Sequence, residues 1–295
     1  MGEINLFRVS DDMSVTEISP DPVELERDVQ TLIEENLEEL LGITFLESEY
    51  STGEKHGGRI DTLGLDENNS PVIIEYKKTQ NENVINQGLY YFDWLVDHKA
   101  EFDNLVHDNI DSDREVDWSS PRLVCIAPDF TKYDSHAVEQ IGQNIELMRF
   151  EKYSGGLLLL ELLNVVEASD DPEPGRQYTT VGEKVQQASN ELLRLYEELD
   201  DFILSLGDDI QKKELKYYIA YKRIQNFVCV YITPDKGEIR LYLKINPDEL
   251  ERMPDIGRDV SETGHYGTGD LELTISSEDE LEISKEYIVR SYEGV

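Results

Sequence analysis

Residues 58–78, GRIDTLGLDENNSPVIIEYKK, constrain the fold of this chain most strongly. Two apolar runs flank a polar turn in this segment, a pattern that predicts a β-hairpin. If the hairpin is symmetric about Asn68, Asp61 and Glu75 lie directly opposite each other. Side chains in directly opposed positions have Cβ atoms about 4.5–5.5 Å apart. Lys77 is two residues beyond Glu75 and would therefore share its face of the sheet.

Two opposed carboxylates destabilise a sheet unless a positive charge compensates them. A divalent cation would do so, and Mg²⁺ prefers one or two carboxylates together with waters and phosphate oxygens. The ammonium group of Lys77 could orient or activate a water molecule, or stabilise the charge that develops on a phosphate. Asp61, Glu75 and Lys77 thus indicate metal-assisted hydrolysis of phosphodiester bonds. A register slip of one residue would instead turn Asp61 to the opposite face.

The surroundings of the hairpin strengthen this hypothesis. Ile73 and Ile74 predict a buried strand, in which Glu75 would need a partner. Gln87 and Tyr91 are four residues apart and would share one face of the following helix. Four basic residues gather near the carboxylates, as phosphate binding requires, and these are Lys55, Arg59, Lys77 and Lys78. The alternative interpretation is an ordinary, half-exposed hairpin.

The order of the predicted elements indicates two domains. We expect a compact α/β domain over residues 1–166, a polar linker over 167–182 and a smaller α+β domain over 183–295. The first domain would begin with an edge strand or arm over residues 1–20. Its expected helices span residues 21–41, 82–106 and 134–148. Its expected strands span residues 43–51, 58–65, 71–78, 122–128 and 155–163.

The second domain is predicted to open with a helix over residues 183–206. Four strands follow, and a final helix begins at a capping box formed by Ser277 and Glu280. The expected strands span residues 215–223, 227–233, 238–245 and 270–276.

Composition limits the class of protein. The chain has 295 residues, with 64 acidic and 27 basic ones, and a formal net charge of −37. This charge excludes a generally basic nucleic-acid binder, and it suggests a halophilic or salt-accumulating source in which salt screens the repulsion. No apolar run approaches the ~20 residues of a membrane span, and we expect a cytoplasmic protein. Cys125 and Cys229 lie in apolar runs and are expected to be core thiols.

The motifs taken together resemble those of a known superfamily. Asp61, then Glu75-Tyr76-Lys77, then Gln87 with Tyr91 resembles the PD-(D/E)XK nucleases, in the RecB-like branch with its Q-x-x-x-Y helix motif. Residues 22–166 are similar to proteins near the mismatch-cleaving endonucleases of archaea. The proline that names the motif is absent, since Ile60 precedes Asp61. The second domain resembles an uncharacterised C-terminal domain that is sometimes labelled a predicted transport protein.

The resemblance implies a restriction-endonuclease-like α-β-β-β-α-β core and an Mg²⁺-dependent or Mn²⁺-dependent DNA endonuclease that acts in repair or in defence. The metal would be held by Asp61, Glu75 and Glu26, helped by the carbonyl of Tyr76. Lys77 would be catalytic, and Gln87 would shape the active site. The resemblance places Tyr91 on the DNA backbone, alongside the basic side chains of Lys55, Arg59 and Lys78. Many members act as homodimers.

Two other readings compete with a nuclease. The chain could be a nuclease-derived module that binds nucleic acid or protein without cutting. It could also be a salt-adapted interaction protein whose hairpin charges are solvated, in which case no specific divalent-metal binding is expected. DNA binding must also overcome a net charge of −37, so we expect modest affinity that falls with salt.

Overall fold

The structure is a computed structural model that describes residues 4–21, 26–78, 84–110, 115–166, 181, 188–215, 217–263 and 267–294. The chain is mixed α/β with several sheets, as the sequence predicts. It divides into two compact units, Met1–Asp170 and Asp171–Val295. Apart from Val181, the predicted linker lies outside the described residues.

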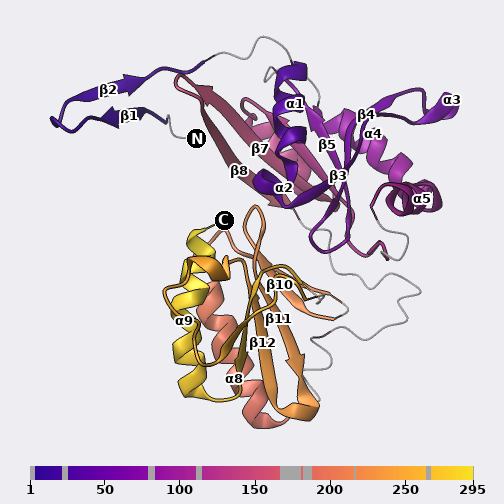
Figure 1. The fold of residues 1–295 in the computed structure, drawn as a ribbon. Coiled ribbons are helices and arrows are strands. Elements are labelled where there is room, and N and C mark those ends of the chain that lie inside the picture. Colours follow the sequence, from indigo (N-terminus) through magenta and orange to yellow (C-terminus); the bar gives the residue numbers. More distant parts are fainter. Residues whose placement is uncertain are drawn as a thin grey trace. The chain divides into compact units, whose positions relative to one another are not determined.

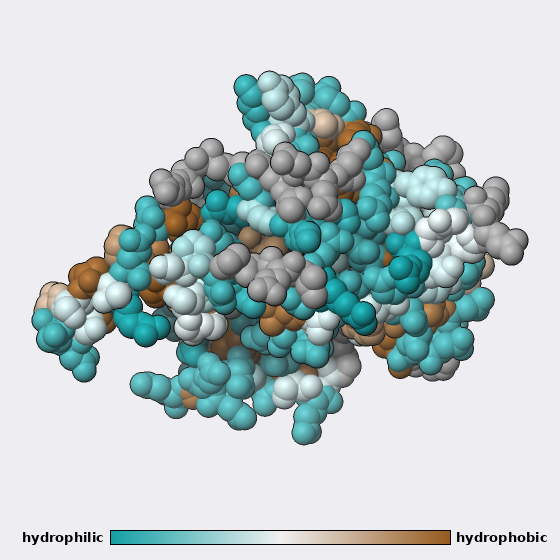
Figure 2. All heavy atoms as spheres, turned by 90° about the horizontal axis from the view of Figure 1, so that it is seen from above, coloured by the Kyte–Doolittle hydropathy of each residue, from teal (hydrophilic) through white to brown (hydrophobic). Residues whose placement is uncertain are grey.

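The N-terminal segment forms a two-stranded hairpin rather than a single edge strand. Strand β1 (Leu6–Val9) pairs antiparallel with β2 (Val15–Ile18). The hairpin is tied to the body of its unit by two backbone hydrogen bonds, from Asp21 to Lys152 and from Ser154 to Ser19. Its outer part exposes large apolar side chains, visible as brown atoms on the projecting arm in Figure 2, and these are Phe7, Val9, Met13 and Val15.

One six-stranded sheet organises the first unit, in the order β3-β4-β5-β6-β7-β8 (Figure 1). Strands β3 to β5 are antiparallel, β5 to β7 are parallel, and β8 is antiparallel to β7. The parallel step from β5 to β6 is bridged by two helices, as parallel pairing requires. The strands are β3 (Ile43–Ser51), β4 (Arg59–Asp66), β5 (Pro71–Tyr76), β6 (Arg122–Ala127), β7 (Asn144–Tyr153) and β8 (Leu157–Val166).

The predicted symmetric register of the central hairpin is confirmed. Thr62 pairs with Ile74, and Leu63 pairs with Ile73, which places Asn68 at the midpoint of the connection. Asp66 closes the turn, because its Oδ1 accepts the backbone N–H groups of Asn68 and Ser70. Side chains alternate along both strands, so this register puts Asp61 and Glu75 on the same face.

Two helices that the sequence predicted as continuous are each broken in two. The first consists of α1 (Glu26–Glu35) and α2 (Leu37–Leu41). The amide Nδ2 of Asn36 donates to the carbonyl of Leu32, while the backbone N–H of Asn36 turns to Ile33. The side chain thus competes with the backbone for the carbonyl four residues earlier, which ends α1.

The second break separates α4 (Val84–Asp97) from α5 (Lys99–Asn109) at His98. The ring nitrogen Nδ1 of His98 lies 2.7 Å from the carbonyl oxygen of Trp94, to which the backbone N–H of His98 also donates at 3.0 Å. No helix in the described part of the chain is both long and apolar enough to cross a membrane.

The predicted helix over residues 134–148 is wrong in its second half. Helix α6 (Lys132–Glu139) starts earlier, at a capping box between Thr131 and Asp134, and strand β7 begins at Asn144. The short apolar run around Leu147 and Met148 fits either a helix or a buried strand by periodicity. Pairing with β6 and β8 on both sides decides for a strand.

Helices α4 and α6 pack on the same face of this sheet. Side chains from α4, α6 and the strands share one buried apolar cluster, which includes Trp94, Val138, Cys125 and Leu147. Gly88 lets α4 approach β6 closely, because a Cβ atom there would lie 2.6 Å from Leu123 Cδ1. Both cysteines are buried and free, as expected.

The second unit is a six-stranded antiparallel sheet with two packed helices. The strand order is β13-β14-β12-β11-β10-β9, and Figure 1 shows α8 and α9 side by side along the sheet. The predicted strand over residues 215–223 contains β10, whereas β9 and β13 were not predicted. The elements are α8 (Asn190–Leu204), β9 (Gln211–Glu214), β10 (Ile219–Lys222), β11 (Asn226–Thr233), β12 (Glu238–Leu243), β13 (Gly257–Asp259), β14 (Leu271–Ile275) and α9 (Glu278–Glu293).

The predicted capping box at the last helix forms with a shifted partner. The hydroxyl of Ser277 accepts the N–H of Glu280, but the Glu280 carboxylate accepts the N–H of Ser276 rather than that of Ser277.

Candidate active site

The structure brings Asp61 and Glu75 together on neighbouring strands. The backbone N–H of Asp61 donates to Glu75 Oε1 at 3.2 Å, and Asp61 Oδ2 accepts the backbone N–H of Tyr76 at 3.0 Å. Glu75 is fully buried, and Asp61 is half-buried. Glu75 Oε2 is buried and has no hydrogen-bond partner among the described residues. The two carboxyl groups are also within side-chain hydrogen-bonding reach of each other, so a shared proton or a bound cation can satisfy this oxygen.

Burial controls the protonation of this pair. Desolvation raises the pKa of Glu75, and the neighbouring Asp61 carboxylate raises it further, to about 9. Desolvation also raises the pKa of Asp61, although the N–H of Tyr76 and the charge of Lys77 oppose it. In the absence of a cation, the pair consequently holds a proton on Glu75 at neutral pH.

Lys77 lies at the end of β5, with its ammonium group largely buried. Its Nζ donates to Glu26 Oε1 at 3.1 Å and to the carbonyl oxygen of Tyr76 at 2.7 Å. Burial lowers the pKa of Lys77, but its hydrogen bond to Glu26 and the nearby carboxylates raise it above the usual value. Lys77 is therefore a cation, held between α1 and the sheet.

Glu26 contacts the candidate site through its hydrogen bond with Lys77. Its second oxygen, Oε2, accepts the backbone N–H of Lys78 at 3.3 Å. Both Glu26 and the Tyr76 carbonyl, which the resemblance assigns to the metal, are thus engaged with the Lys77–Lys78 segment in this structure. The side chain of Lys78 is exposed at the same strand end.

A buried polar layer holds α1 against the hairpin, and the sequence analysis missed it. Gln30 is 6% exposed, and its Nε2 donates to the carbonyl of Asp61 at 2.9 Å and to Glu34 at 3.1 Å. Glu34 in turn accepts the hydroxyls of Ser48 and Thr62. The signal in the sequence was a polar pair, Gln30 and Glu34, four residues apart beside the apolar stripe of the helix.

Tyr91 supports the strand that carries Asp61. Its hydroxyl accepts the backbone N–H of Arg59 at 3.2 Å, and its ring lies against Gly58, where a Cβ atom would be 2.6 Å away. Tyr91 is itself buried, so it supports the backbone of β4 and does not present its ring to solvent. Gln87, one helical turn earlier on α4, is half-buried.

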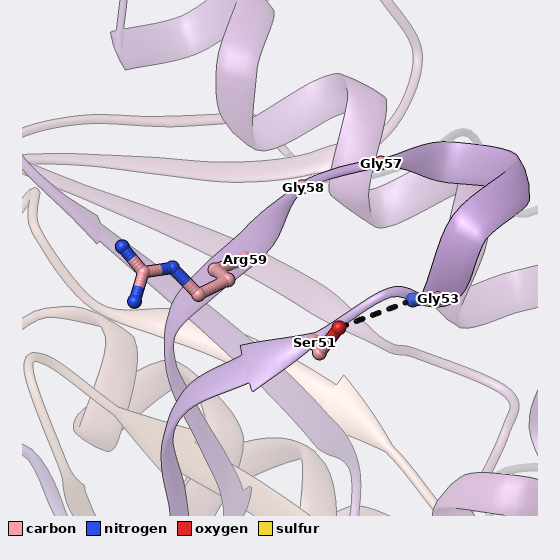
Figure 3. Close-up of a pocket in the computed structure, with 5 residues that line it drawn as sticks. All are labelled: Ser51, Gly53, Gly57, Gly58 and Arg59. Atoms are coloured by element: carbon pink, nitrogen blue, oxygen red, sulfur yellow. Dashed lines mark hydrogen bonds between the residues drawn. The ribbon is translucent and has the colours of Figure 1, made fainter.

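An open hollow borders this strand end and is lined by Ser51, Gly53, Gly57, Gly58 and Arg59 (Figure 3). The guanidinium of Arg59 points away from Ser51 and Gly53 in that view and pairs with Glu49 at 3.1 Å. The side chain of Lys55, in the short helix α3 (Gly53–His56), lies outside the described part of the structure.

The donor set suits Mg²⁺ better than a transition metal. No group of three or more His, Cys, Asp or Glu side chains surrounds a common point in the described ranges. Mg²⁺ needs fewer protein ligands, since it keeps several waters and takes one or two carboxylates. Asp61 and the orphaned Glu75 Oε2 supply those two carboxylates, so the residues present fit such an ion.

Comparison with known proteins identifies relatives without assigning an activity. Residues 181–294 match a family described as a domain of unknown function (DUF5655). An uncharacterised protein of Haemophilus influenzae is 31% identical over 287 residues, which cover 91% of this chain and 93% of the relative. No solved structure matches. The chain belongs to the same family as the uncharacterised Haemophilus influenzae protein, to which it is similar over both units.

Proposed function

We propose that the chain is a metal-dependent nuclease that hydrolyses phosphodiester bonds of DNA, with Mg²⁺ or Mn²⁺ as its cofactor. The observation that carries the proposal is the buried pair of Asp61 and Glu75, with one unsatisfied carboxylate oxygen, beside the cationic Lys77. A buried, desolvated carboxylate pair is costly for a fold, and a bound divalent cation would offset that cost.

The residues of the candidate site divide the work between them in this proposal. Asp61 and Glu75 hold the ion, which acts as a Lewis acid on the phosphodiester when bound. Lys77 places its positive charge where a phosphate oxygen gains negative charge in the transition state. Glu26 holds the ammonium group at that place through its 3.1 Å contact. Tyr91 holds the start of β4 through its hydrogen bond with the backbone N–H of Arg59, and Gln87 would shape the wall formed by α4.

Three further observations support a nuclease. The elements from α1 to β6 run helix, strands, helix, strand, the order that the sequence resemblance implies. Strand β5 pairs in parallel with β6. Ligands of parallel sheets bind beyond the carboxyl ends of the strands, and Glu75 and Lys77 lie at that end of β5. Arg59 and Lys78 are exposed beside the carboxylates, where they can contact phosphates.

Cleavage of end-labelled DNAs tests the proposal. Single-stranded, duplex, branched and mismatched substrates are incubated with the full chain and Mg²⁺ or Mn²⁺ over a range of KCl concentrations. We expect cleavage that requires the metal, stops with EDTA and falls by at least about 100-fold in Lys77→Ala. The matched control is Lys236→Ala, which removes an exposed lysine from the second unit.

Metal binding distinguishes an active nuclease from a nuclease-derived protein that has lost its activity. Isothermal titration should show one Mg²⁺ or Mn²⁺ site that is lost in Asp61→Asn and in Glu75→Gln. If the folded chain neither binds the metal nor cuts any substrate, the proposal is wrong, and a binding module without catalysis takes its place.

A further inference from the structure

Helix α6 presents an exposed aromatic ring and a lysine after the loop that follows β6. Tyr133 is 71% exposed, which is unusual for so large a ring. The ammonium of Lys132 lies 5.1 Å from the centre of that ring. The two residues open helix α6, immediately after the loop that follows β6.

Helix α6 packs on the same face of the sheet as Glu75. Cys125 stands opposite Glu75 in the parallel register of β5 and β6. Further along α6, Val138 packs into the cluster that contains Cys125.

The ends of β5 and β6 are also joined directly. The backbone N–H of Lys77 donates to the carbonyl of Ile126 at 2.9 Å. Lys77 therefore lies level with the last residues of β6, and the chain runs from there to Lys132 in six residues. Strand neighbours are about 4.8 Å apart, so this loop borders the candidate active site.

We propose that Lys132 and Tyr133 bind the nucleic-acid segment next to the bond that is cut, and that Tyr133 stacks on an unpaired base. The inference rests on the proposed function and adds a substrate class to it, namely DNA that is single-stranded at the cleavage site. An exposed ring with a cation beside it offers a base both a stacking surface and a phosphate contact. In duplex DNA the bases already stack on each other, so the ring of Tyr133 gains nothing from them.

The chemistry of Lys132 and Tyr133 suits single-stranded DNA better than a protein partner. Stacking on an aromatic ring is sequence-tolerant, because every base has a π face. Lys132 adds one of the few cations of a chain that carries 27 basic and 64 acidic residues. Lys132 follows the carboxyl end of β6 by five residues, so it adds a cation on the β6 side of β5, whereas Arg59 lies on β4, on the other side of β5.

Binding measured without cleavage tests this inference separately from the nuclease proposal. Fluorescence anisotropy with labelled single-stranded and duplex DNA is recorded in EDTA, with the full chain and its variants. We expect Tyr133→Ala to weaken binding of single strands roughly 5- to 100-fold, Tyr133→Phe to retain it, and duplex binding to change little. Lys132→Ala should lower the slope of log affinity against log salt by about 0.7 on single strands.

Two controls make the result decisive. Lys236→Ala removes the same charge from the chain but lies on the second unit, so the salt slope should stay as in the unaltered protein. If Tyr133→Ala loses the preference for single strands, the proposed binding surface is supported. This holds even if no variant cleaves DNA, an outcome in which the nuclease proposal fails. Metal-dependent cleavage with equal affinity of the unaltered protein and Tyr133→Ala for single strands overturns the inference and leaves the nuclease proposal intact.

Discussion

Asp61 and Glu75 face each other across the β4–β5 hairpin, and the backbone N–H of Asp61 donates to Glu75 Oε1 at 3.2 Å. Burial and the Asp61 carboxylate raise the pKa of Glu75 to about 9, compared with 4.5 when the group is free. Between these two values the folded chain binds a proton that the unfolded chain has lost. The contribution of Glu75 to stability is therefore full in acid and declines as the pH rises toward 9.

This linkage predicts a pH-dependent effect of Glu75→Gln in the metal-free protein. Gln keeps the shape of the neutral acid, so the variant should gain stability relative to the unaltered chain on going from about pH 5.5 to about pH 8. Urea denaturation in EDTA at both pH values measures the difference. Glu47→Gln, which changes an exposed carboxylate on β3, should show no such trend. Parallel pH profiles for Glu75→Gln and the unaltered chain would contradict the assignment.

The contact between Glu26 and Lys77 predicts that Glu26 acts on the lysine and not on the metal. Glu26→Gln should lower kcat by about 10-fold and change the Mg²⁺ affinity by less than about threefold, because the ion is held by the other two carboxylates. Titration calorimetry and steady-state cleavage measure the two effects. Glu35→Gln, on an exposed position of the same helix, serves as control. A large loss of Mg²⁺ affinity in Glu26→Gln would make it a metal ligand.

The hydrogen bond between Gln30 on α1 and the carbonyl of Asp61 predicts that Gln30 stabilises the fold around the site. Gln30→Ala removes the side-chain donor of the buried Asp61 carbonyl and one of the three donors of the Glu34 carboxylate. The free energy of unfolding should fall by about 1–3 kcal/mol. Gln143→Ala, at an exposed position, should stay within about 0.5 kcal/mol of the unaltered chain. Urea denaturation compares the two, and equal stability of both variants would contradict the role of Gln30.

A buried ion pair between β6 and β7 predicts that removing one partner costs more stability than removing both. Arg122 Nη1 contacts the Glu146 carboxylate at 2.6 and 2.7 Å, and Asp66 lies 3.4 Å from its Nε. Arg122→Met should cost about 3–5 kcal/mol, because it leaves buried carboxylates without a counter-charge. The double variant Arg122→Met/Glu146→Leu should recover part of that loss. A double variant less stable than Arg122→Met would show that the pair is not the source.

The acidity of the chain predicts stabilisation by salt. A net charge of −37 repels itself, and the Debye length falls to about 3 Å at 1 M salt. The melting temperature should therefore rise as KCl increases from about 0.1 M to about 2 M. Thermal melts followed by circular dichroism measure this, and a flat or falling melting temperature would count against a salt-adapted chain.

The candidate site could be predicted from residue spacing because a hairpin couples positions by simple arithmetic. The polar turn around Asn68 sets the register, and the register alone makes Asp61 and Glu75 neighbours. Burial of Glu75 could also be predicted, since Ile73 and Ile74 precede it in an apolar run. The hydrogen-bond partners of the site that come from distant segments could not be predicted in this way. Gln30 reaches the Asp61 carbonyl only because α1 packs across the hairpin.

Local patterns by themselves determined the mixed α/β class, most strands and the apolar stripes of the helices, because these depend on periodicities within one segment. Tertiary structure decided that residues 144–153 form a strand between β6 and β8. It also decided that Glu26 pairs with Lys77 across 51 residues of sequence. Such outcomes depend on contacts between segments, whose free energy is gained only when both segments are in place.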